Sequence, residues 1–564
     1  MKFLSLFLCL AFLLTSANVF AAPADKDAVL SALFESDIAS AREALDQGLI
    51  TCVELTEYFL ERIEAYNQEF NCFITLCDNA LEEAAKRDEL LASSEEHSML
   101  LGIPIVVKDN IDYEGYPTSD GHWTYGAVAW ESATVVQNLL DAGAVILGKT
   151  NMSTEAQEAQ FTASDAIGET PNAYDTTLSA GGSSGGSAVS VSLNFCYAGL
   201  GTDTNASLRY PAVLNGCITM RSTKGLMDRD GILILNGTRD VPGTITRSVA
   251  DQAIVLGEMA GVDYYSNLNA NALEGKRIGV LQELCYNETA LTYRRESKMD
   301  SEIKTVFEET VNNLRSLGAT VIPVSIPDIY TLVENCEYNS PYAIEQYMSE
   351  YEELFAERKL DALVFPTYLH TPDNSLSNIG WDDVSYDAFY SNCKYVSSPL
   401  GVPEISITIG YHSKGSGIGM EITALNGQDQ LLLDIAYTYT ENFNPRVVPQ
   451  TAPSLYEGTM SLAELLGQQE VPPVTEETTG TEATEPTETT ATTDATSPEE
   501  PTEATQVTEE PMEETTPPTT AAPADTGFIT AQDRQPLMLM GGLAALFIIC
   551  MIGKLVKKFL SPQS

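Results

Sequence analysis

The chain alternates between segments with helical spacing of apolar residues and short continuous apolar runs. Residues 27–87 carry apolar side chains at helical spacings, with charged residues between them. Six later runs are short and apolar enough to predict buried strands, at 101–107, 144–147, 277–281, 319–324, 362–365 and 404–409. This alternation predicts α/β layers around a largely buried sheet. Because no repeat or internal linker interrupts residues 24–467, we expect one large domain there.

The first residues have the pattern of an export signal. Met1 and Lys2 precede an apolar run over residues 3–14, and polar residues then lead to Ala21 and Ala22. This order is typical of a secretory signal peptide, which we expect to occupy residues 1–21. A buried N-terminal helix is the alternative, and the break before Pro23 disfavours it.

A second apolar segment lies near the other end of the chain. Residues 537–553 are uncharged and mostly apolar, which is close to the lower limit for a membrane-spanning helix. Lysines follow at 554, 557 and 558, so we expect a span over 537–556 and a cytoplasmic tail over 557–564. The domain would then be held at the cell membrane by a single span, on the extracytoplasmic side. A core helix and a cell-wall sorting signal, loosely matched by residues 523–527, are the alternatives.

Composition separates a linker from the domain. Thr, Glu and Pro dominate residues 468–533, and such a stretch buries too little apolar surface to fold, so it predicts a disordered stalk. An acidic binding tail is the competing interpretation.

The net charge of the whole chain is −50, and 14 acidic residues without any Lys or Arg lie in residues 471–530. This balance excludes an ordinary nucleic-acid binder, which needs clustered cations.

The cysteines and histidines give no metal-binding pattern. Outside the predicted signal and span lie Cys52, Cys72, Cys77, Cys196, Cys217, Cys285, Cys336 and Cys393. Their even number permits disulfides in an oxidising compartment, although the apolar surroundings of Cys196 and Cys217 predict buried free thiols. There is no Cys-x-x-Cys pair and the four histidines are scattered, so a metal site is not expected.

The densest chemical signal is the segment Ser-Ala-Gly-Gly-Ser-Ser-Gly-Gly-Ser over residues 179–187. A phosphate loop is excluded, because no Gly-Lys-Ser/Thr follows. A nucleophile elbow fits formally, since Ser183 lies in a Gly-x-Ser-x-Gly pattern and His370 or His412 could complete an esterase triad. A flexible linker is the third interpretation, and the apolar run that follows disfavours it.

The neighbouring segment Gly-Thr-Asp-Thr-Asn-Ala-Ser-Leu-Arg-Tyr-Pro, residues 201–211, decides between these interpretations. Together with the glycine-serine segment it resembles the amidase signature family. Four further segments resemble family landmarks in the family's order, at 102–110, 148–151, 246–251 and 398–406. The resemblance covers most of residues 30–445 and implies a mixed β-sheet core covered by helices.

The resemblance also implies a mechanism, amide hydrolysis by a Ser-cisSer-Lys triad without a cofactor. The matching positions are Ser207 as nucleophile, Ser183 as bridging serine and Lys108 as base. A lysine can act as a base only where its surroundings favour the neutral amine, and Lys108 ends an apolar run where desolvation would do so. Taken singly, a strand-end lysine or a serine among glycines is more often a solvated charge or a turn.

The resemblance places the oxyanion hole, which stabilises the tetrahedral intermediate, at Thr204, Asn205, Ala206 and the nucleophile itself. Asn205 and Ala206 stand where the family commonly has Gly-Gly, so a surface binding protein that keeps the fold and has lost the chemistry is a second hypothesis. Ser184, Asp203 and Arg209 match positions that support the loop.

The expected partner is a small amide. The acidic domain disfavours anionic ligands, so neutral or cationic amides are expected first.

Overall fold

The computed structural model describes residues 25–93, 97–124, 126–285, 299–337, 340–370, 391–458 and 460–467. The predicted signal peptide, stalk, membrane span and cytoplasmic tail lie outside the described residues. Within those ranges, no helix combines the length and the apolarity needed to cross a bilayer.

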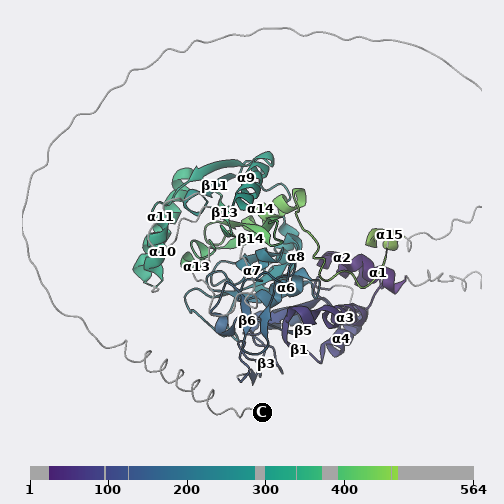
Figure 1. The fold of residues 1–564 in the computed structure, drawn as a ribbon. Coiled ribbons are helices and arrows are strands. Elements are labelled where there is room, and N and C mark those ends of the chain that lie inside the picture. Colours follow the sequence, from purple (N-terminus) through teal and green to yellow (C-terminus); the bar gives the residue numbers. More distant parts are fainter. Residues whose placement is uncertain are drawn as a thin grey trace, which may run out of the picture. The chain divides into compact units, whose positions relative to one another are not determined.

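One mixed sheet of eleven strands runs through the domain in the order β1-β5-β2-β8-β10-β9-β14-β15-β13-β11-β12 (Figure 1). β2 is parallel to β5 and β8, β11 is parallel to β12 and β13, and the other neighbours are antiparallel. All six runs predicted as strands lie in this sheet, which confirms the predicted α/β class. The strands are β1 (Phe73–Leu76), β2 (Pro104–Lys108), β5 (Val145–Thr150), β8 (Ala198–Asp203), β9 (Ile218–Arg221), β10 (Val241–Thr246), β11 (Arg277–Leu281), β12 (Thr320–Val324), β13 (Ala362–Pro366), β14 (Glu404–Tyr411) and β15 (Gly417–Thr423).

Helices pack against the sheet along its length. α6 contacts β8 and β10, α7 contacts β9 and β14, and α9 contacts β12. In Figure 1, α9, α10 and α11 gather near β11 and β13, whereas α3 and α4 lie near β1 and β5 at the other end. The helices are α1 (Lys26–Leu33), α2 (Ile38–Asp46), α3 (Cys52–Phe70), α4 (Ala80–Ser93), α5 (Thr134–Asp141), α6 (Gly185–Ser192), α7 (Arg209–Leu214), α8 (Val249–Ala260), α9 (Ser301–Ser316), α10 (Ile329–Cys336), α11 (Pro341–Arg358), α13 (Ser397–Leu400), α14 (Asp429–Asn442) and α15 (Leu462–Gly467).

Short elements complete the fold. They are the ribbon of β3 (Pro117–Thr118) and β4 (Ala127–Val128), the ribbon of β6 (Thr162–Ser164) and β7 (Gly168–Thr170), and the 3-10 turns η1 (Thr154–Ala156), η2 (Tyr265–Asn267) and η3 (Gln282–Leu284).

The helical pattern predicted over residues 27–87 is wrong at Phe73–Leu76, where the chain forms β1. α3 begins at a capping box formed by Thr51 and Glu54, and ends at Asn71, whose φ of 49° is left-handed. β1 follows and pairs antiparallel with β5 before α4 begins. The apolar residues of β1 therefore serve sheet pairing, which local periodicity cannot distinguish from one more helical turn.

The middle of the sheet brings together the two segments that carry the chemical signal. β2 ends at Lys108 and its parallel neighbour β8 ends at Asp203. Parallel neighbours present their carboxyl ends at the same edge of a sheet. The end of β2 and the loop after β8 therefore lie side by side.

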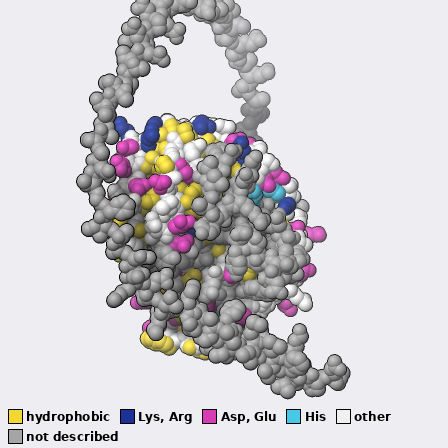
Figure 2. All heavy atoms as spheres, turned by 60° about the vertical axis from the view of Figure 1, so that its left-hand side comes forward, with side chains coloured by type: hydrophobic (Ala, Val, Ile, Leu, Met, Phe, Trp, Pro, Cys, Tyr) yellow, Lys and Arg dark blue, Asp and Glu magenta, His cyan; other side chains and the backbone are white. Residues whose placement is uncertain are grey.

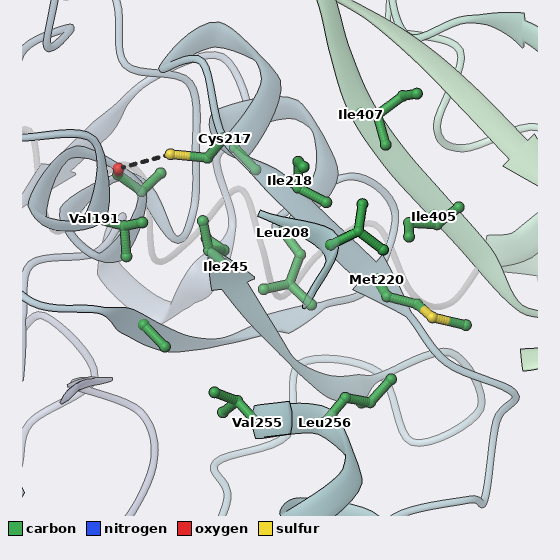
Figure 3. Packing of buried hydrophobic residues seen from close by; sticks show 14 of the residues in the cluster. Val191, Leu208, Cys217, Ile218, Met220, Ile245, Val255, Leu256, Ile405 and Ile407 are labelled. Carbon is green, nitrogen blue, oxygen red and sulfur yellow. Dashed lines mark hydrogen bonds between the residues drawn. The ribbon is translucent and has the colours of Figure 1, made fainter. Parts of the chain in front are cut away.

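The segment after β8 is fixed in the hydrophobic core by Leu208 (Figure 3). Its side chain lies against Gly201 of β8 and Gly243 of β10, and a Cβ built at either glycine would come within 2.7 Å of it. The glycines thus let Leu208 approach the sheet closely, which holds the preceding residue, Ser207, at the sheet edge.

All eight cysteines in the described part of the chain are buried free thiols. The prediction of buried free thiols at Cys196 and Cys217 is confirmed, and the permitted disulfides do not form among the described residues.

On the face in Figure 2, Asp and Glu side chains are spread over the described surface, while Lys and Arg lie mainly toward its upper edge.

Candidate active site

Lys108 and Ser183 are in direct contact. The Nζ of Lys108 donates to Ser183 Oγ at 2.7 Å and to Thr202 Oγ1 at 2.9 Å. Asn110 Nδ2 also donates to Thr202 Oγ1, at 3.1 Å. Lys108 and Ser183 are both 0% exposed. The structure therefore brings together two of the three residues predicted as the triad.

The environment of Lys108 favours the neutral amine. Burial lowers its pKa from 10.5 to about 7, and the carboxylates of Asp120, Asp240 and Asp203 raise it by less than burial lowers it. Among the described residues, Lys108 forms no ion pair. Near neutral pH this lysine can accept a proton, which an ordinary surface lysine cannot do.

The glycine-serine loop is shaped by close contacts inside the protein. A Cβ at Gly182 would lie 2.3 Å from the carbonyl oxygen of Phe161, and one at Gly186 would lie 2.3 Å from that of Asn151. The peptide bond between Gly182 and Ser183 is cis. The loop then enters α6, whose Ser187 is joined to Thr150 at the end of β5 by a hydrogen bond of 2.7 Å between their hydroxyls. These contacts place Ser183 opposite the end of β2.

Ser207 lies beside this loop through the backbone. The N–H of Ser184 donates to the carbonyl oxygen of Ser207 at 3.1 Å, and Ser184 Oγ donates to the carbonyl oxygen of Thr202 at 3.3 Å. Ser207 is 5% exposed. In the described part of the structure, no hydrogen bond joins the hydroxyls of Ser183 and Ser207. The two loops are thus held together by main-chain contacts, while the nucleophile assignment stays a prediction.

The predicted oxyanion hole has free donors. Among the described residues, the backbone N–H groups of Thr204, Asn205, Ala206 and Ser207 donate no hydrogen bond. Successive backbone N–H groups without a partner in the protein can donate to a negatively charged oxygen, so these four groups suit an oxyanion.

Asn205 and Ala206 fit this loop without backbone strain. Neither residue has a positive φ, so the conformation does not require the glycines common in the family. The side-chain oxygen of Asn205 accepts from Arg239 Nη1 at 2.9 Å, and Thr204 Oγ1 donates to Asp240 at 2.5 Å. The side chains of Asn205 and Thr204 therefore both have fixed partners in the protein.

A buried ion network supports the loop from behind. Arg209 donates to both carboxylate oxygens of Asp203, at 2.9 and 3.1 Å, and contacts Glu404. Asp203 also accepts from Arg221 at 3.1 Å and from the N–H of Leu208 at 3.1 Å. Burial alone would raise the pKa of Asp203, but the two guanidinium groups lower it to about 2. These contacts join Asp203 and Arg209 to the loop, and their supporting role stays a prediction.

The loop between β9 and β10 joins both halves of the site. The N–H of Leu233 donates to the carbonyl oxygen of Asn110 at 2.9 Å, and further along Asp240 and Arg239 hold Thr204 and Asn205. Leu233, Ile234 and Leu235 are 46%, 44% and 43% exposed. This loop therefore gives the site an exposed apolar border.

The esterase interpretation is not supported. Ser183 contacts a lysine, and residues 171–184 contain no strand leading into α6, which a nucleophile elbow requires. The ring of His412 lies 3.6 Å from Asp300 and 3.7 Å from Glu302.

Sequence reasoning missed several contributors to the site. Thr202 lies within the segment that carried the resemblance, so its signal was present. Glu404 likewise lies within the landmark segment 398–406, so its signal was present too. Asp120, Arg221 and Arg239 lie outside the segments quoted for the resemblance, and only the folded chain brings them to the site.

Comparison with known proteins agrees with this geometry. A family model described as "Amidase" matches residues 54–344. A glutamyl-tRNA(Gln) amidotransferase component from Lawsonia intracellularis is 36% identical over 289 residues, covering 49% of this chain and 57% of that protein. The same component from Caldanaerobacter subterraneus subsp. tengcongensis is 26% identical over 501 residues, covering 74% of this chain and 98% of that protein.

A solved structure shares the fold. Native peptide amidase from Stenotrophomonas maltophilia matches with a TM-score of 0.65 and 26% identity, covering 75% of this chain and 99% of that protein. The 6-aminohexanoate cyclic dimer hydrolase matches with a TM-score of 0.62 at 22% identity, which speaks for the fold alone.

Proposed function

Because this chain belongs to the amidase signature family, we propose that it hydrolyses a carboxamide to a carboxylic acid and ammonia or an amine through an acyl-serine intermediate. The scissile bond would be a C–N bond other than a peptide bond. The observation that carries the proposal is the contact between Ser183 Oγ and a fully buried Lys108 whose pKa is lowered to about 7.

In the proposed mechanism, Ser207 Oγ attacks the amide carbon while its proton passes through Ser183 to neutral Lys108. The unpaired N–H groups of residues 204–207 stabilise the oxyanion. The C–N bond breaks as the proton returns through Ser183 to the leaving nitrogen. Water then attacks the acyl-serine ester by the same proton route and releases the acid.

The test is a comparison of the full-length protein with Ser207→Ala. A fluorophosphonate probe should label the wild type and not the variant, and hydrolysis across an amide panel should fall by at least about 10⁴-fold. Ser93→Ala, at an exposed serine of α4, is the matched control and should behave as the wild type. Labelling that persists in Ser207→Ala would show that another residue is the nucleophile.

A second candidate is a role in an amidotransferase, which the names of the curated relatives favour. The net charge of −50 opposes binding to tRNA without a partner. Glutamine supplied with glutamyl-tRNA, and with ATP to activate the glutamyl carboxylate, separates the two: hydrolysis of simple amides without any transfer to tRNA supports the amidase.

We also propose that a single membrane span anchors the protein and that the domain lies outside the cytoplasm. The support for this location is the sequence pattern at residues 1–21 and 537–556. Protease added to intact cells should remove the domain if this is right, and a domain protected until the cells are lysed contradicts it.

A further inference from the structure

Asp120 has the largest effect of any charged group on the pKa of Lys108, and the residue after that lysine, Asp109, anchors the loop that carries Asp120. Asp109 Oδ2 accepts from the N–H of Ser119 at 3.1 Å, from Ser119 Oγ at 2.5 Å and from the N–H of Gly121 at 3.2 Å. Asp120 lies between these two anchored residues, and its carbonyl oxygen accepts from the N–H of Glu155 at 2.9 Å. The backbone on both sides of Asp120 is therefore fixed.

The conformation of Asp120 is unusual for a residue with a side chain. Its φ of 52° is left-handed, a region that L residues seldom adopt. Such conformations persist where surrounding contacts over-determine them, and they concentrate at functional sites. Here the contacts of Asp109 supply that constraint, so the loop sets the backbone conformation at Asp120.

One oxygen of this carboxylate is buried without a partner. Asp120 Oδ1 accepts no hydrogen bond from any described residue. Buried carboxylate oxygens are nearly always paired, and an exception calls for an explanation such as an absent ligand. Burial raises the pKa of Asp120 to about 6, with Asp109 and Glu155 acting in the same direction and Lys108 and His122 acting against it.

Asp120 differs from the other two carboxylates that act on Lys108. Asp203 is paired with two arginines. Asp240 accepts from the hydroxyl of Thr204 and from the N–H groups of Leu235 and Asn236. Asp120 has no comparable partner on Oδ1, and among the described residues it forms no ion pair with Lys108.

The charge balance at Asp120 changes in the reactive state. Lys108 must be neutral to act as a base, and a neutral amine no longer balances the carboxylate of Asp120. At that point the site holds a fixed negative charge with a free, buried acceptor. A positive group on the ligand is what such a site is suited to bind.

We propose that Asp120 is a specificity-determining residue that binds a cationic ammonium group of the substrate. This inference rests on the proposed amidase function and narrows its substrate class to amides that carry an amine near the scissile group.

The experiment uses the full-length protein with three primary amides of similar size: β-alaninamide, which is cationic, butyramide, which is neutral, and succinamate, which is anionic. At pH 8, kcat/KM should be about tenfold or more higher for β-alaninamide than for butyramide, and lowest for succinamate, because only the cation forms a charge-assisted hydrogen bond with Asp120. Asp120→Asn should remove the preference for the cation, chiefly through KM.

Glu155→Gln is the matched control. It removes a nearby negative charge whose oxygens already have partners, His122 at 3.0 Å and Gln157 at 2.6 Å, so the preference should persist. Asp120→Ala provides a second variant should Asp120→Asn fold poorly, and the wild-type order of the three amides tests the proposal without any variant.

The outcomes separate this inference from the function it rests on. If Ser207 is not labelled by fluorophosphonate and no amide is hydrolysed, the amidase proposal fails and the inference fails with it. If Ser207 is labelled but β-alaninamide and butyramide are hydrolysed equally, only the role of Asp120 is overturned. If Ser207 is labelled but neither amide is hydrolysed, each amide is tested for its ability to protect Ser207 from the fluorophosphonate. Equal protection by β-alaninamide and butyramide overturns the role of Asp120.

Discussion

Lys108 and Arg209 are both fully buried cations within one active-site region, yet their surroundings differ. Lys108 ends β2 with two hydroxyls as partners and no ion pair among the described residues. Arg209 begins α7 and is paired with Asp203 and Glu404. Burial lowers the pKa of Lys108 to about 7, while burial likewise opposes charge on Arg209 but its carboxylate partners raise its pKa above the ordinary value.

This difference shows how one active-site region can contain a buried cation that reacts and another that only stabilises the structure. A buried cation without a paired carboxylate becomes a base that can exchange a proton. A buried cation with paired carboxylates stays charged and fixes the segments that it joins. On the reactive side of the site the buried cation, Lys108, thus has no paired carboxylate among the described residues. On the supporting side the buried cation, Arg209, is paired with Asp203 and Glu404.

The largest expected effect comes from removing the base. Lys108→Met should lower kcat/KM for amides by about 10³-fold, because Ser207 then has no proton acceptor. The melting temperature should stay the same or rise, since a buried group that resists charging is replaced by an apolar one. Lys108→Arg should be equally inactive, because a guanidinium stays protonated. Substantial activity in Lys108→Arg would contradict the assignment of the base.

The supporting side should respond in the opposite way. Arg209→Met leaves Asp203 and Glu404 buried without their main partner, so the free energy of unfolding should fall by about 3–5 kcal/mol. Denaturant unfolding of the wild type, Arg209→Met and Lys108→Met measures this contrast directly. Equal stability of the two variants would remove the distinction between the two sides.

The pH profile sharpens the assignment of Lys108. Because the base form is the neutral amine, kcat/KM should fall about tenfold per pH unit below a pKa of about 7 and level off above it. In Asp120→Asn this limb should move to lower pH, since the Asp120 carboxylate raises the pKa of Lys108. The Glu155→Gln profile serves as the comparison, and a limb that does not move in Asp120→Asn would mean that Asp120 has no influence on the base.

The smallest expected effect concerns the departure from Gly-Gly. Changing Asn205 and Ala206 together to glycine should alter kcat/KM by less than about threefold, because neither residue has a left-handed φ. The melting temperature should fall slightly, since glycine adds freedom to the unfolded chain. If neither the wild type nor the Gly-Gly variant hydrolyses any amide while the wild type binds a ligand, the binding-protein hypothesis is right.

Local patterns predicted the strands well and failed where pairing decided the outcome. The runs at 277–281 and 362–365 coincide with β11 and nearly coincide with β13, because continuous apolar stretches have few uses other than a buried strand. β1 was predicted as helix, because four residues carry too little periodicity to reveal a partner strand. The segments quoted for the resemblance contain Lys108, Ser183 and Thr202, and the structure brings these three into contact.

The sequence by itself determined the α/β class, the family resemblance and the residue types available for catalysis, because these depend on short-range pattern and on motifs contiguous along the chain. Only the tertiary structure decided which groups surround Lys108, the pairing of Arg209 with Glu404 and the isolation of Asp120 Oδ1. Each of these depends on burial and on charges that lie far apart along the chain. Electrostatic energies follow distance and dielectric in space, so no local sequence pattern encodes them.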